Sequence, residues 1–384
     1  MTRPSEHRPT AVIVSNQAIR HNLSQVTHQL QSDQQIYAVV KANAYGHGAV
    51  EIARIVQEEG VDGLAVATVD EAIELRQHDI DLPILVLGLS DPRGIAEVLL
   101  YDITIVVSNL DYFNQAYQQL VQTKQTHLLT EYNLSIHLAI DTGMGRIGLQ
   151  TEQEIRTFVD GIRDYEWVDW QGVFTHFSTA SEGPQAYIET QWQRWQKWLS
   201  LIPETVTCRH FANSAMSFHP QWGHASDIVR LGISLYGLDP SDTYPTKNHL
   251  MPALSLVSEI MYVKQIQAGM SVSYGATYTA SEPEWIATIP IGYADGWLRH
   301  YQSIPVLIQG QACPIVGVIN MDQIMVNLPY YIPAGTTVTL IGQDGSMNNA
   351  ASKIARHVGT IGYEVLTSLS SRIPRIYLEE EESC

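Results

Sequence analysis

The chain has 384 residues, 45% hydrophobic and 16% charged, as expected for a globular protein long enough to form two domains. Its net charge of −18 (22 basic minus 40 acidic) argues against a nucleic acid or an anionic membrane as partner. Three widely spaced cysteines offer neither a disulfide framework nor metal-ligand spacing, which favours a reducing, cytoplasmic setting and no metal. No apolar stretch approaches the ~20 residues of a membrane span, and the polar first ten residues are no signal peptide.

Short apolar runs alternate with amphipathic segments through the first two-thirds of the chain. The expected strands are Ile36–Val40, Gly63–Ala67, Ile84–Gly88, Ile103–Val107, Ser135–Ile140, Gly172–Thr175, Cys208–Phe211 and Ile228–Leu231. The expected helices are Ala49–Glu59, Val69–Gln77, Arg93–Leu100, Leu110–Val121, Glu152–Arg163 and Tyr187–Leu201. Strands that alternate with helices pair in parallel, so eight units in about 230 residues predict a (β/α)₈ TIM barrel; an open doubly wound sheet is the alternative.

The pattern changes after Pro240. Residues 241–245 indicate a linker, and short strand patterns with Gly and Pro between them follow. The expected strands are Leu254–Ile266, Trp285–Pro290, Ile304–Ile308, Cys313–Val318, Ile324–Leu328 and Thr336–Ile341, and only Asn348–His357 is expected to be helical. We therefore expect a barrel over residues 14–245 and a mostly antiparallel β domain over 246–384. The strand around 10–14 could pair in either domain, and we assign it to the second.

Lys41 is the most informative residue, because it ends the apolar strand pattern that includes Tyr37–Val40 and precedes a small-residue loop. A lysine at the end of a buried strand is partly desolvated, which lowers its pKa and frees its lone pair for Schiff-base chemistry with a carbonyl. The ordinary alternative is a lysine that simply reaches water. The flanking Tyr45, Gly46 and Gly48 favour the chemical interpretation.

Four more groups of polar residues stand at the ends of other expected strands. They are Asp141–Arg146, His176, Asn213-Ser214 and Arg230–Ile233. Each alone has an ordinary explanation as a turn, a structural histidine, a helix N-cap or a surface cation. Catalytic groups of a barrel sit at the C-terminal ends of its strands, so five such ends favour one shared site.

The segment Arg230–Gly237 adds a possible phosphate site. A glycine after the last strand leaves backbone N–H groups accessible, and the loops after strands 7 and 8 commonly bind phosphate in barrels. Ser214 offers a hydroxyl there, and Tyr45 could reach across from the first loop. A Schiff-base lysine and a phosphate site match the two ends of pyridoxal phosphate.

With these features, the chain resembles the alanine racemases, the fold-type III pyridoxal-phosphate enzymes, over nearly its whole length. The matching motifs are Val40–Gly48, Asp141–Gly148, Thr175–Phe177, Ala212–Ala215, Arg230–Leu238, Val272–Ala280, Ile291–Gly296 and Asn320–Asp322. The resemblance implies a pyridoxal-phosphate-dependent isomerase that interconverts L-alanine and D-alanine for peptidoglycan. It implies two bases on opposite faces of the substrate, which are Lys41 and Tyr274. Tyr274 would come from the other subunit of a homodimer.

The resemblance also implies the remaining site. Arg230 would face the pyridine nitrogen and keep it neutral, because a guanidinium stays protonated and cannot accept a proton. His176 would lie near Arg230 and help Tyr274 to ionise, and Arg146 would approach the substrate carboxylate and the cofactor's phenolate oxygen. The other implied residues are Tyr45, Ser214, Gly232 and Ile233 around the phosphate, Asn213 in the cofactor site, Met321, whose backbone binds the substrate carboxylate, and Tyr293 at the entrance to the active site.

Three positions depart from the family. Ala139 stands where many members carry a carbamylated lysine that holds the arginine matching Arg146, so another anion such as chloride, or another side chain, must orient Arg146, or it is held less firmly. Ser371 stands where some members place a phosphate-binding tyrosine. Asn320 stands where others have cysteine, a change that we expect to be mild.

Three alternatives remain at this stage. A related racemase for serine or larger amino acids would share both bases and differ only in pocket size. A barrel decarboxylase with the same cofactor would lack Tyr274 in its Ser-Tyr-Gly-Ala-Thr setting. A noncatalytic pyridoxal-phosphate carrier would be a bare barrel, without a β domain that carries Tyr274 and Met321.

Overall fold

The computed structural model describes residues 4–218, 225–241 and 249–379. The chain forms two compact units. The barrel unit comprises 20–44 and 49–250, and the β unit comprises 1–19, 45–48 and 251–384. The short segment 45–48, directly after the Lys41 loop, thus belongs to the β unit. All of the expected linker except Ser241 lies outside the described residues.

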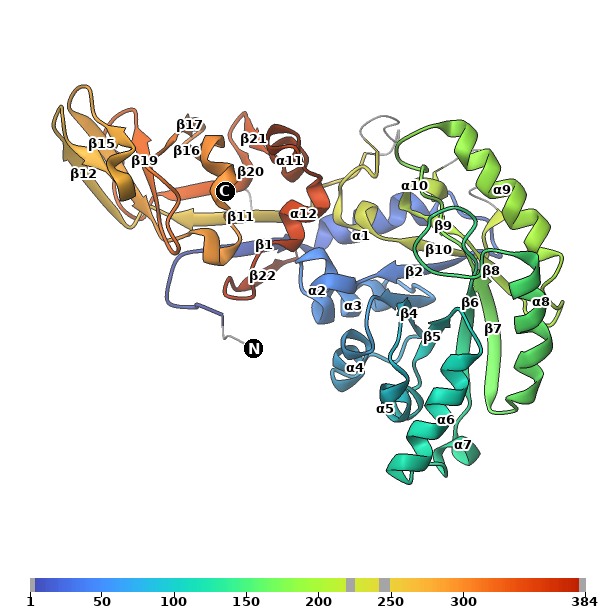
Figure 1. Cartoon of the computed structure of the whole chain (residues 1–384). Coiled ribbons are helices and arrows are strands. Elements are labelled where there is room, and N and C mark those ends of the chain that lie inside the picture. Colours follow the sequence, from blue (N-terminus) through green and yellow to red (C-terminus); the bar gives the residue numbers. More distant parts are fainter. Residues whose placement is uncertain (1–3, 219–224, 242–248, 380–384) are drawn as a thin grey trace. The chain divides into compact units, whose positions relative to one another are not determined.

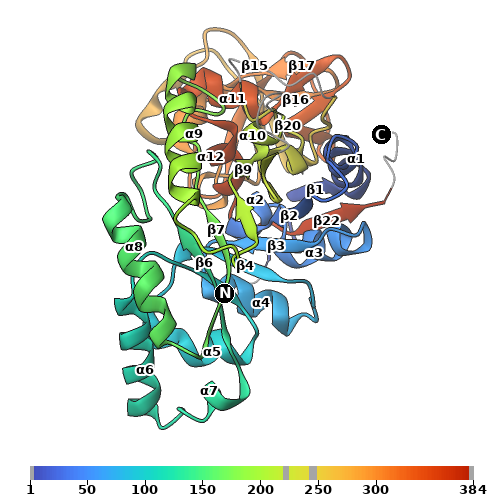
Figure 2. The ribbon, with the colours of Figure 1, turned by 90° about the vertical axis from the view of Figure 1, so that its right-hand side faces the viewer.

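The barrel unit is built on a nine-stranded, all-parallel sheet in the order β8-β7-β6-β5-β4-β3-β2-β10-β9 (Figures 1 and 2). Its strands are β2 (Gln35–Val39), β3 (Gly63–Val66), β4 (Ile84–Leu89), β5 (Thr104–Val107), β6 (Leu134–Ala139), β7 (Val168–Phe174), β8 (Cys208–His210), β9 (Ala212–Asn213) and β10 (Ile228–Leu231). Only Phe211 separates β8 from β9, and these two strands pair with β7 and β10, so one stretch of chain closes the sheet. The predicted TIM barrel is confirmed.

Helices cover the outside of this sheet (Figure 2). They are α1 (Asn16–Thr27), α3 (Ala49–Glu58), α4 (Val69–Gln77), η1 (Pro92–Gly94), α5 (Ile95–Leu100), α6 (Asp111–Thr123), α7 (Leu128–Glu131), α8 (Glu152–Gly161), η2 (Ile162–Asp164) and α9 (Gln185–Leu199), with the short α10 (Ser214–Ser217) and η4 (Ile233–Tyr236) after β9 and β10. Thr68 and Glu71 begin α4 with a capping box, in which each side chain accepts from the other residue's backbone N–H. The same pairing of Thr151 with Glu154 begins α8.

The described residues of the β unit form three sheets. The strands are β1 (Ala11–Ser15), β11 (Leu254–Glu259), β12 (Tyr262–Ile266), β13 (Ser271–Val272), β14 (Tyr278–Thr279), β15 (Glu284–Ile289), β16 (Val306–Ile308), β17 (Gln311–Cys313), β18 (Ile315–Val316), β19 (Ile324–Leu328), β20 (Thr337–Asp344), β21 (Met347–Asn349) and β22 (Arg375–Leu378). The orders are β17-β16-β20-β11-β1-β22 with β21 on β20, β12-β15-β19-β18, and β13-β14. Every pair is antiparallel except β1 with β22. The N-terminal strand thus pairs inside the β unit.

Two helices follow these sheets, α11 (Ala351–Val358) and α12 (Gly362–Thr367). The expected helix at Asn348–His357 corresponds to α11, but its first residues belong to β21. The expectation of a single helix was wrong, because six residues are too few for α12 to show a helical period. Among the described residues, no helix combines the length and apolar character needed to cross a membrane.

Candidate functional site

Lys41 follows β2 and begins a turn, α2 (Lys41–Tyr45), in which the backbone is left-handed. Ala42, Asn43 and Ala44 have φ of 52–53° and ψ of 48–51°. The expected loop is therefore a left-handed helical turn without glycine, a conformation that costs an L-residue roughly 1–2 kcal/mol per residue. Such strain persists only where the surroundings enforce it.

Two side chains enforce this turn. Glu71, at the start of α4, accepts the Ala42 N–H through Oε1 at 2.7 Å. Asn43 Oδ1 accepts the Ala49 N–H at 2.8 Å, which ties the turn to the first residue of α3. The polar contacts on both sides of the turn therefore fix the backbone position of Lys41.

The ammonium group of Lys41 is partly buried. Burial, followed by the positive charge of Arg146, lowers its pKa, while Glu71 opposes the shift and Arg230 adds to it. The desolvation expected from the sequence thus lowers the pKa of this lysine, and the charges of two guanidinium groups lower it further. A lower pKa increases the fraction of neutral amine, which is the nucleophilic and basic form.

Arg230 on β10 is buried, and both of its terminal nitrogens form hydrogen bonds. Its Nη1 lies 2.6 Å from His210 Nδ1, and its Nη2 donates to the carbonyls of Thr175 and Phe211 at 3.1 Å each. The ring of Phe174 lies 5.4 Å from the guanidinium carbon. Burial lowers the pKa of Arg230 to about 9, so the group remains a fixed cation at neutral pH.

His176 lies directly beside this cation. Its Nδ1 is 3.5 Å from Arg230 Nη2, and its Nε2 is 3.3 Å from the side-chain nitrogen of Asn213. Asn213 Oδ1 accepts the Met216 N–H at 2.9 Å, which orients the amide so that its NH₂ group faces His176. Burial and the charge of Arg230 lower the pKa of His176 to about 3, so the ring is neutral at physiological pH.

Arg230 also contacts one of a pair of histidines, His210 and His137, that sequence reasoning missed. His210 Nε2 is 2.8 Å from His137 Nδ1 on β6. Because Arg230 donates to His210 Nδ1, the neutral ring carries its proton on Nε2 and donates it to His137. Gly172 on β7 makes room for this contact, since a Cβ there would lie 2.9 Å from the His137 ring.

His137, Cys208 and His210 lie close enough together to resemble a metal site. The ring nitrogens that face each other are already hydrogen-bonded, and Arg230 lies 2.6 Å from His210. A metal cation would therefore meet a fixed positive charge in a buried region, where charge repulsion is strong. This arrangement favours a hydrogen-bond chain that holds Arg230.

The expected phosphate loops meet at the ends of β9 and β10. Ser214 begins α10, and its Oγ accepts the Gly232 N–H at 2.9 Å. Ile233 follows Gly232 and begins η4, and all three residues are buried. The structure therefore brings Ser214, Gly232 and Ile233 together, and the Ser214 hydroxyl, which accepts from the Gly232 N–H, keeps its own proton to donate to an anion.

Arg146 lies in the loop that Asp141 organises after β6. Asp141 accepts the Gly143 and Gly145 N–H groups at 3.0 Å. Burial would raise the Asp141 pKa, but these bonds and one from Gln150 lower it overall. Among the described residues, the exposed Arg146 side chain forms no hydrogen bond or ion pair.

Ala139, where the family often has lysine, offers Arg146 no anionic group. It is buried in an apolar cluster with Leu85, Val106 and Phe174. No side chain among the described residues therefore takes the place of the lysine and orients Arg146. The remaining possibilities are a bound anion or a less firmly held guanidinium.

Tyr45 is buried in the β unit, where its ring lies 5.9 Å from that of Tyr363. Burial, followed by Tyr363, raises its pKa. Two side chains of β22 hold the segment that follows: Arg375 donates to the Gly46 carbonyl at 3.1 Å, and Tyr377 donates to the His47 carbonyl at 3.0 Å. Tyr45 is thus a fixed side chain that remains neutral at physiological pH.

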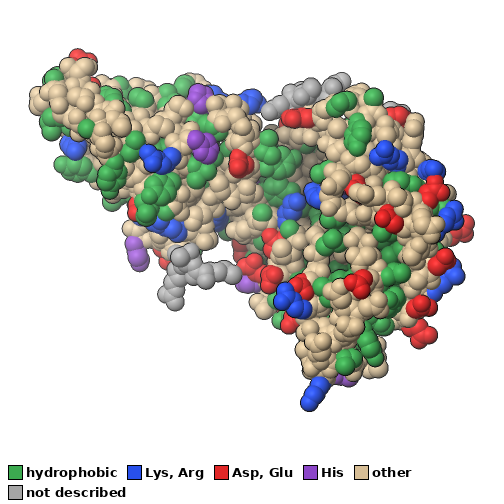
Figure 3. Space-filling view, viewed as in Figure 1, with side chains coloured by type: hydrophobic (Ala, Val, Ile, Leu, Met, Phe, Trp, Pro, Cys, Tyr) green, Lys and Arg blue, Asp and Glu red, His purple; other side chains and the backbone are tan. Residues whose placement is uncertain are grey.

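The other expected residues of the β unit are exposed. Tyr274 is 76% exposed, Met321 53% and Tyr293 39%, and Ser371 is also exposed. Hydrophobic side chains gather on the face of the β unit seen in Figure 3. Tyr293 and Met321 are neighbours, because the Tyr293 N–H donates to the Asn320 carbonyl at 3.0 Å. Large exposed apolar groups of this kind commonly mark an interaction surface.

The fold and the site define a class of protein: a (β/α)₈ barrel with a lysine and two arginines at its strand ends, joined to a β unit. Residues 14–240 match the alanine racemase N-terminal domain and residues 253–377 the alanine racemase C-terminal domain. The chain is 44% identical over 374 residues to an alanine racemase of Ligilactobacillus salivarius, covering 97% of this chain and 98% of that protein. The chain therefore belongs to the alanine racemase family and is an isomerase.

Solved structures agree with this assignment. An alanine racemase from E. faecalis superimposes with a TM-score of 0.92 at 40% identity, covering 98% of this chain and 100% of that one. A structure described as a histidine racemase from Leuconostoc mesenteroides subsp. sake superimposes with a TM-score of 0.90 at 32% identity, again over 98% and 100%. Closely similar structures in the family thus carry names that refer to different amino acids.

Proposed function

We propose that this enzyme interconverts L-alanine and D-alanine. The observation that carries the proposal is Lys41, a partly buried lysine whose pKa is lowered beside Arg146 and Arg230, in a chain whose residues 14–240 and 253–377 match the two alanine racemase domains. D-alanine made in this way would supply peptidoglycan. Because the few cysteines suit a reducing compartment, we place the enzyme in the cytoplasm.

We propose pyridoxal phosphate as the cofactor, since the residues of the barrel fit its chemistry. Lys41, Arg146 and Arg230 gather positive charge in a protein of net charge −18, which suits an anionic group. Lys41 would hold the carbonyl end, the Ser214, Gly232 and Ile233 loops the phosphate with Tyr45, and Arg230 would face the ring nitrogen near Asn213. When bound, the cofactor withdraws electrons from the substrate Cα and makes the Cα proton removable.

Racemisation needs proton transfer on both faces of Cα, and two side chains would divide this work. Lys41 would exchange the proton on one face, and the partner's Tyr274 on the other. Arg146 and the backbone N–H of the partner's Met321 would hold the substrate carboxylate between them. His176 is neutral, with a pKa of about 3, and its one ring N–H could donate a hydrogen bond to the Tyr274 phenolate, which would favour the ionised form of the tyrosine.

We propose a homodimer with shared active sites. The support is the exposure of Tyr274 and Met321, which are costly to present to water unless another surface covers them. In a two-fold dimer, each β unit would complete the site of the other barrel, and Tyr293 would line the entrance. A stable and active monomer in sedimentation measurements would contradict this arrangement.

Tyr274→Phe tests the two-base assignment. Racemisation must slow equally in both directions, because the equilibrium constant between mirror images is one. The informative quantity is therefore exchange of the Cα proton in heavy water, followed by proton NMR for each enantiomer separately. We expect exchange to persist for the enantiomer that faces Lys41 and to fall by about 10²–10⁴-fold for the other. Equal, mild losses for both enantiomers would contradict the assignment.

A related racemase for larger amino acids is the second candidate, because a similar structure is described as a histidine racemase. Ser371 is exposed and small where some family members place a tyrosine, which removes bulk near the expected phosphate contact. Rates with serine, histidine and alanine at equal concentrations would separate the two candidates. A higher kcat/KM for histidine or serine than for alanine would replace the first proposal by the second.

A further inference from the structure

The backbone that carries Tyr274 is strained. The loop joins β13 to β14, and within it Ser273 has φ 70° and ψ −178°, and Ala276 has φ 46°. Residues with a side chain rarely adopt these angles, which persist only where surrounding contacts over-determine them. The contacts on either side of the loop therefore decide where Tyr274 points.

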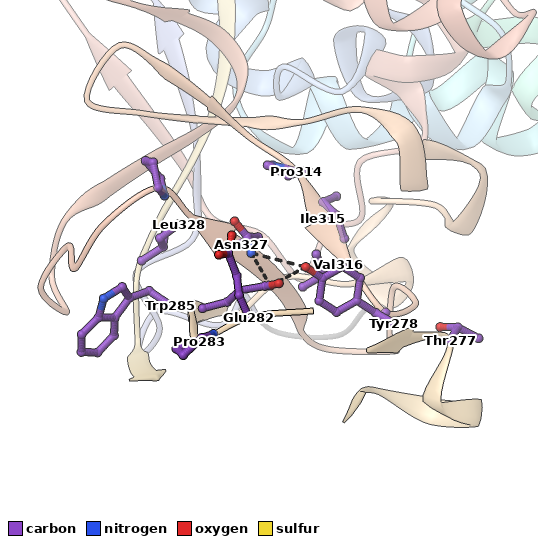
Figure 4. Close-up of a pocket in the computed structure, with 13 residues that line it drawn as sticks. Thr277, Tyr278, Glu282, Pro283, Trp285, Pro314, Ile315, Val316, Asn327 and Leu328 are labelled. Carbon is purple, nitrogen blue, oxygen red and sulfur yellow. Dashed lines mark hydrogen bonds between the residues drawn. The ribbon is translucent and has the colours of Figure 1, made fainter. Parts of the chain in front are cut away.

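The C-terminal side of the loop is held through Tyr278. Its hydroxyl donates to Glu284 on β15, and the Asn327 side chain on β19 donates to the same carboxylate oxygen at 2.7 Å. Dashed lines in Figure 4 join these groups, which line a cavity of about 620 Å³ together with Trp285. Neither Tyr274 nor Met321 lines that cavity.

The N-terminal side of the loop is held through Ser273. Its Oγ donates to the Val318 carbonyl at 3.1 Å and to Asn320 Oδ1 at 3.2 Å. Gly317 permits this approach, because a Cβ at that position would lie 2.4 Å from the Ser273 Cβ. A hydroxyl has one proton, so Ser273 donates to one of these two oxygens at a time, while the Asn320 side-chain nitrogen faces the Met325 sulfur at 4.0 Å.

Asn320 connects Ser273 with the other two exposed residues. Its carbonyl accepts the Tyr293 N–H at 3.0 Å, and its own N–H donates to the Gln323 carbonyl at 3.0 Å. Met321 is the next residue in the chain, and its carbonyl accepts the Ala294 N–H at 3.0 Å. The backbone of Asn320 thus fixes Tyr293 and Met321, and its side chain reaches the Tyr274 loop.

We propose that Asn320 is a positioning residue that sets Tyr274, Tyr293 and Met321 at fixed distances from one another before any partner is bound. The proposal rests on the proposed function, because it assigns these residues to one shared site. An amide suits the task, since it can both donate and accept, whereas the thiol of cysteine is a weak donor and a weak acceptor. Asn320 would thus help to determine the geometry of the site.

A double-mutant cycle tests the proposal on the full-length enzyme with pyridoxal phosphate and alanine. Ser273→Ala, Asn320→Ala and the double variant are compared, with Asn348→Ala, an exposed asparagine of β21, as the control. Each single change should slow Cα-proton exchange on the Tyr274 face by about 2- to 10-fold, the worth of one hydrogen bond, and leave exchange on the Lys41 face unchanged. The double variant should be no slower than the slower single variant, because both single changes remove the same Ser273–Asn320 bond.

A second readout does not depend on activity. Amide hydrogen exchange should become faster in residues 271–279 for both single variants and remain as in the wild type for Asn348→Ala. Additive losses in the cycle, or unchanged amide exchange in that segment, would overturn the role of Asn320. A wild-type enzyme that exchanges no Cα proton would instead contradict the proposed function, and amide exchange would still decide whether the bond holds the loop.

Discussion

The barrel unit and the β unit hold their candidate functional groups in opposite ways. In the barrel, Arg230 is buried and His176 is half-buried, and a chain of hydrogen bonds joins Arg230 to His210 and His137. In the β unit, Tyr274 and Met321 are exposed, and only the backbone that carries them is firmly bonded. In the barrel, burial thus fixes the side chains themselves. In the β unit, hydrogen bonds fix the backbone from which the exposed side chains extend.

This difference indicates what each region can do alone. A buried network is electrostatically complete and can shift pKa values without help, as the lowered pKa of Lys41 illustrates. An exposed tyrosine meets ordinary water, so its chemistry must come from whatever surface covers it. We therefore expect substitutions in the barrel to act by breaking hydrogen bonds, and substitutions in the β unit to act by changing the backbone geometry.

The largest effect should come from Arg230→Lys. A lysine keeps the charge but lacks the planar guanidinium that bonds to His210 and two backbone carbonyls at once. Loss of these hydrogen bonds should lower the unfolding free energy by about 1–3 kcal/mol. Displacement of the fixed cation should also lower kcat/KM by about 10²-fold. Denaturant unfolding and racemisation assays would measure both. The exposed Arg163→Lys is the matched control, and equal behaviour of the two variants would contradict the comparison.

The buried histidines predict a loss of stability in acid. Burial, followed by the charge of Arg230, lowers the pKa of His137 and His176 to about 3 and that of His210 well below 6.5. As pH falls from about 6.5 towards 3, the unfolded chain binds protons that the folded chain does not. Each such histidine should therefore reduce the unfolding free energy by about 1.4 kcal/mol per pH unit in that range.

His137→Gln would isolate one of these contributions. Unfolding free energy measured between pH 4 and pH 7 should fall less steeply with acid in this variant, even if its stability at pH 7 is lower. The exposed His7→Gln is the control and should keep the wild-type slope. An unchanged slope for His137→Gln would mean that this ring takes up its proton in the folded state.

The sequence predicted the barrel well, because each of its strands is a local apolar run between helical patterns. The ends of β3 and β10, for example, differ from expectation by no more than one residue. The left-handed turn after Lys41 could not be predicted, since Ala-Asn-Ala contains no glycine, and Glu71, which enforces the turn, lies 29 residues away. Tertiary contacts decide that conformation.

The polar contacts of the site could also not be predicted from local sequence patterns. His137 looks like one polar residue in an apolar strand until Gly172, on the neighbouring strand, allows it to reach His210. The paired appearance of histidines on nearby strands was an available signal. Asn320 and Ser273 are 47 residues apart in the sequence, so their side-chain contact is found only in the folded β unit.

The smallest expected effect concerns Arg146, the most exposed cation of the barrel site. Ala139 supplies no anion and no described side chain bonds to Arg146, so a chloride ion would be the simplest partner. Because an exposed ion pair is worth about 0–1 kcal/mol, replacing chloride by gluconate at constant ionic strength should raise KM for alanine by up to about fivefold. Arg146→Gln should remove this dependence. A KM that is the same in both salts would mean that substrate alone orients Arg146, as expected if its carboxylate is the only anion that the guanidinium meets.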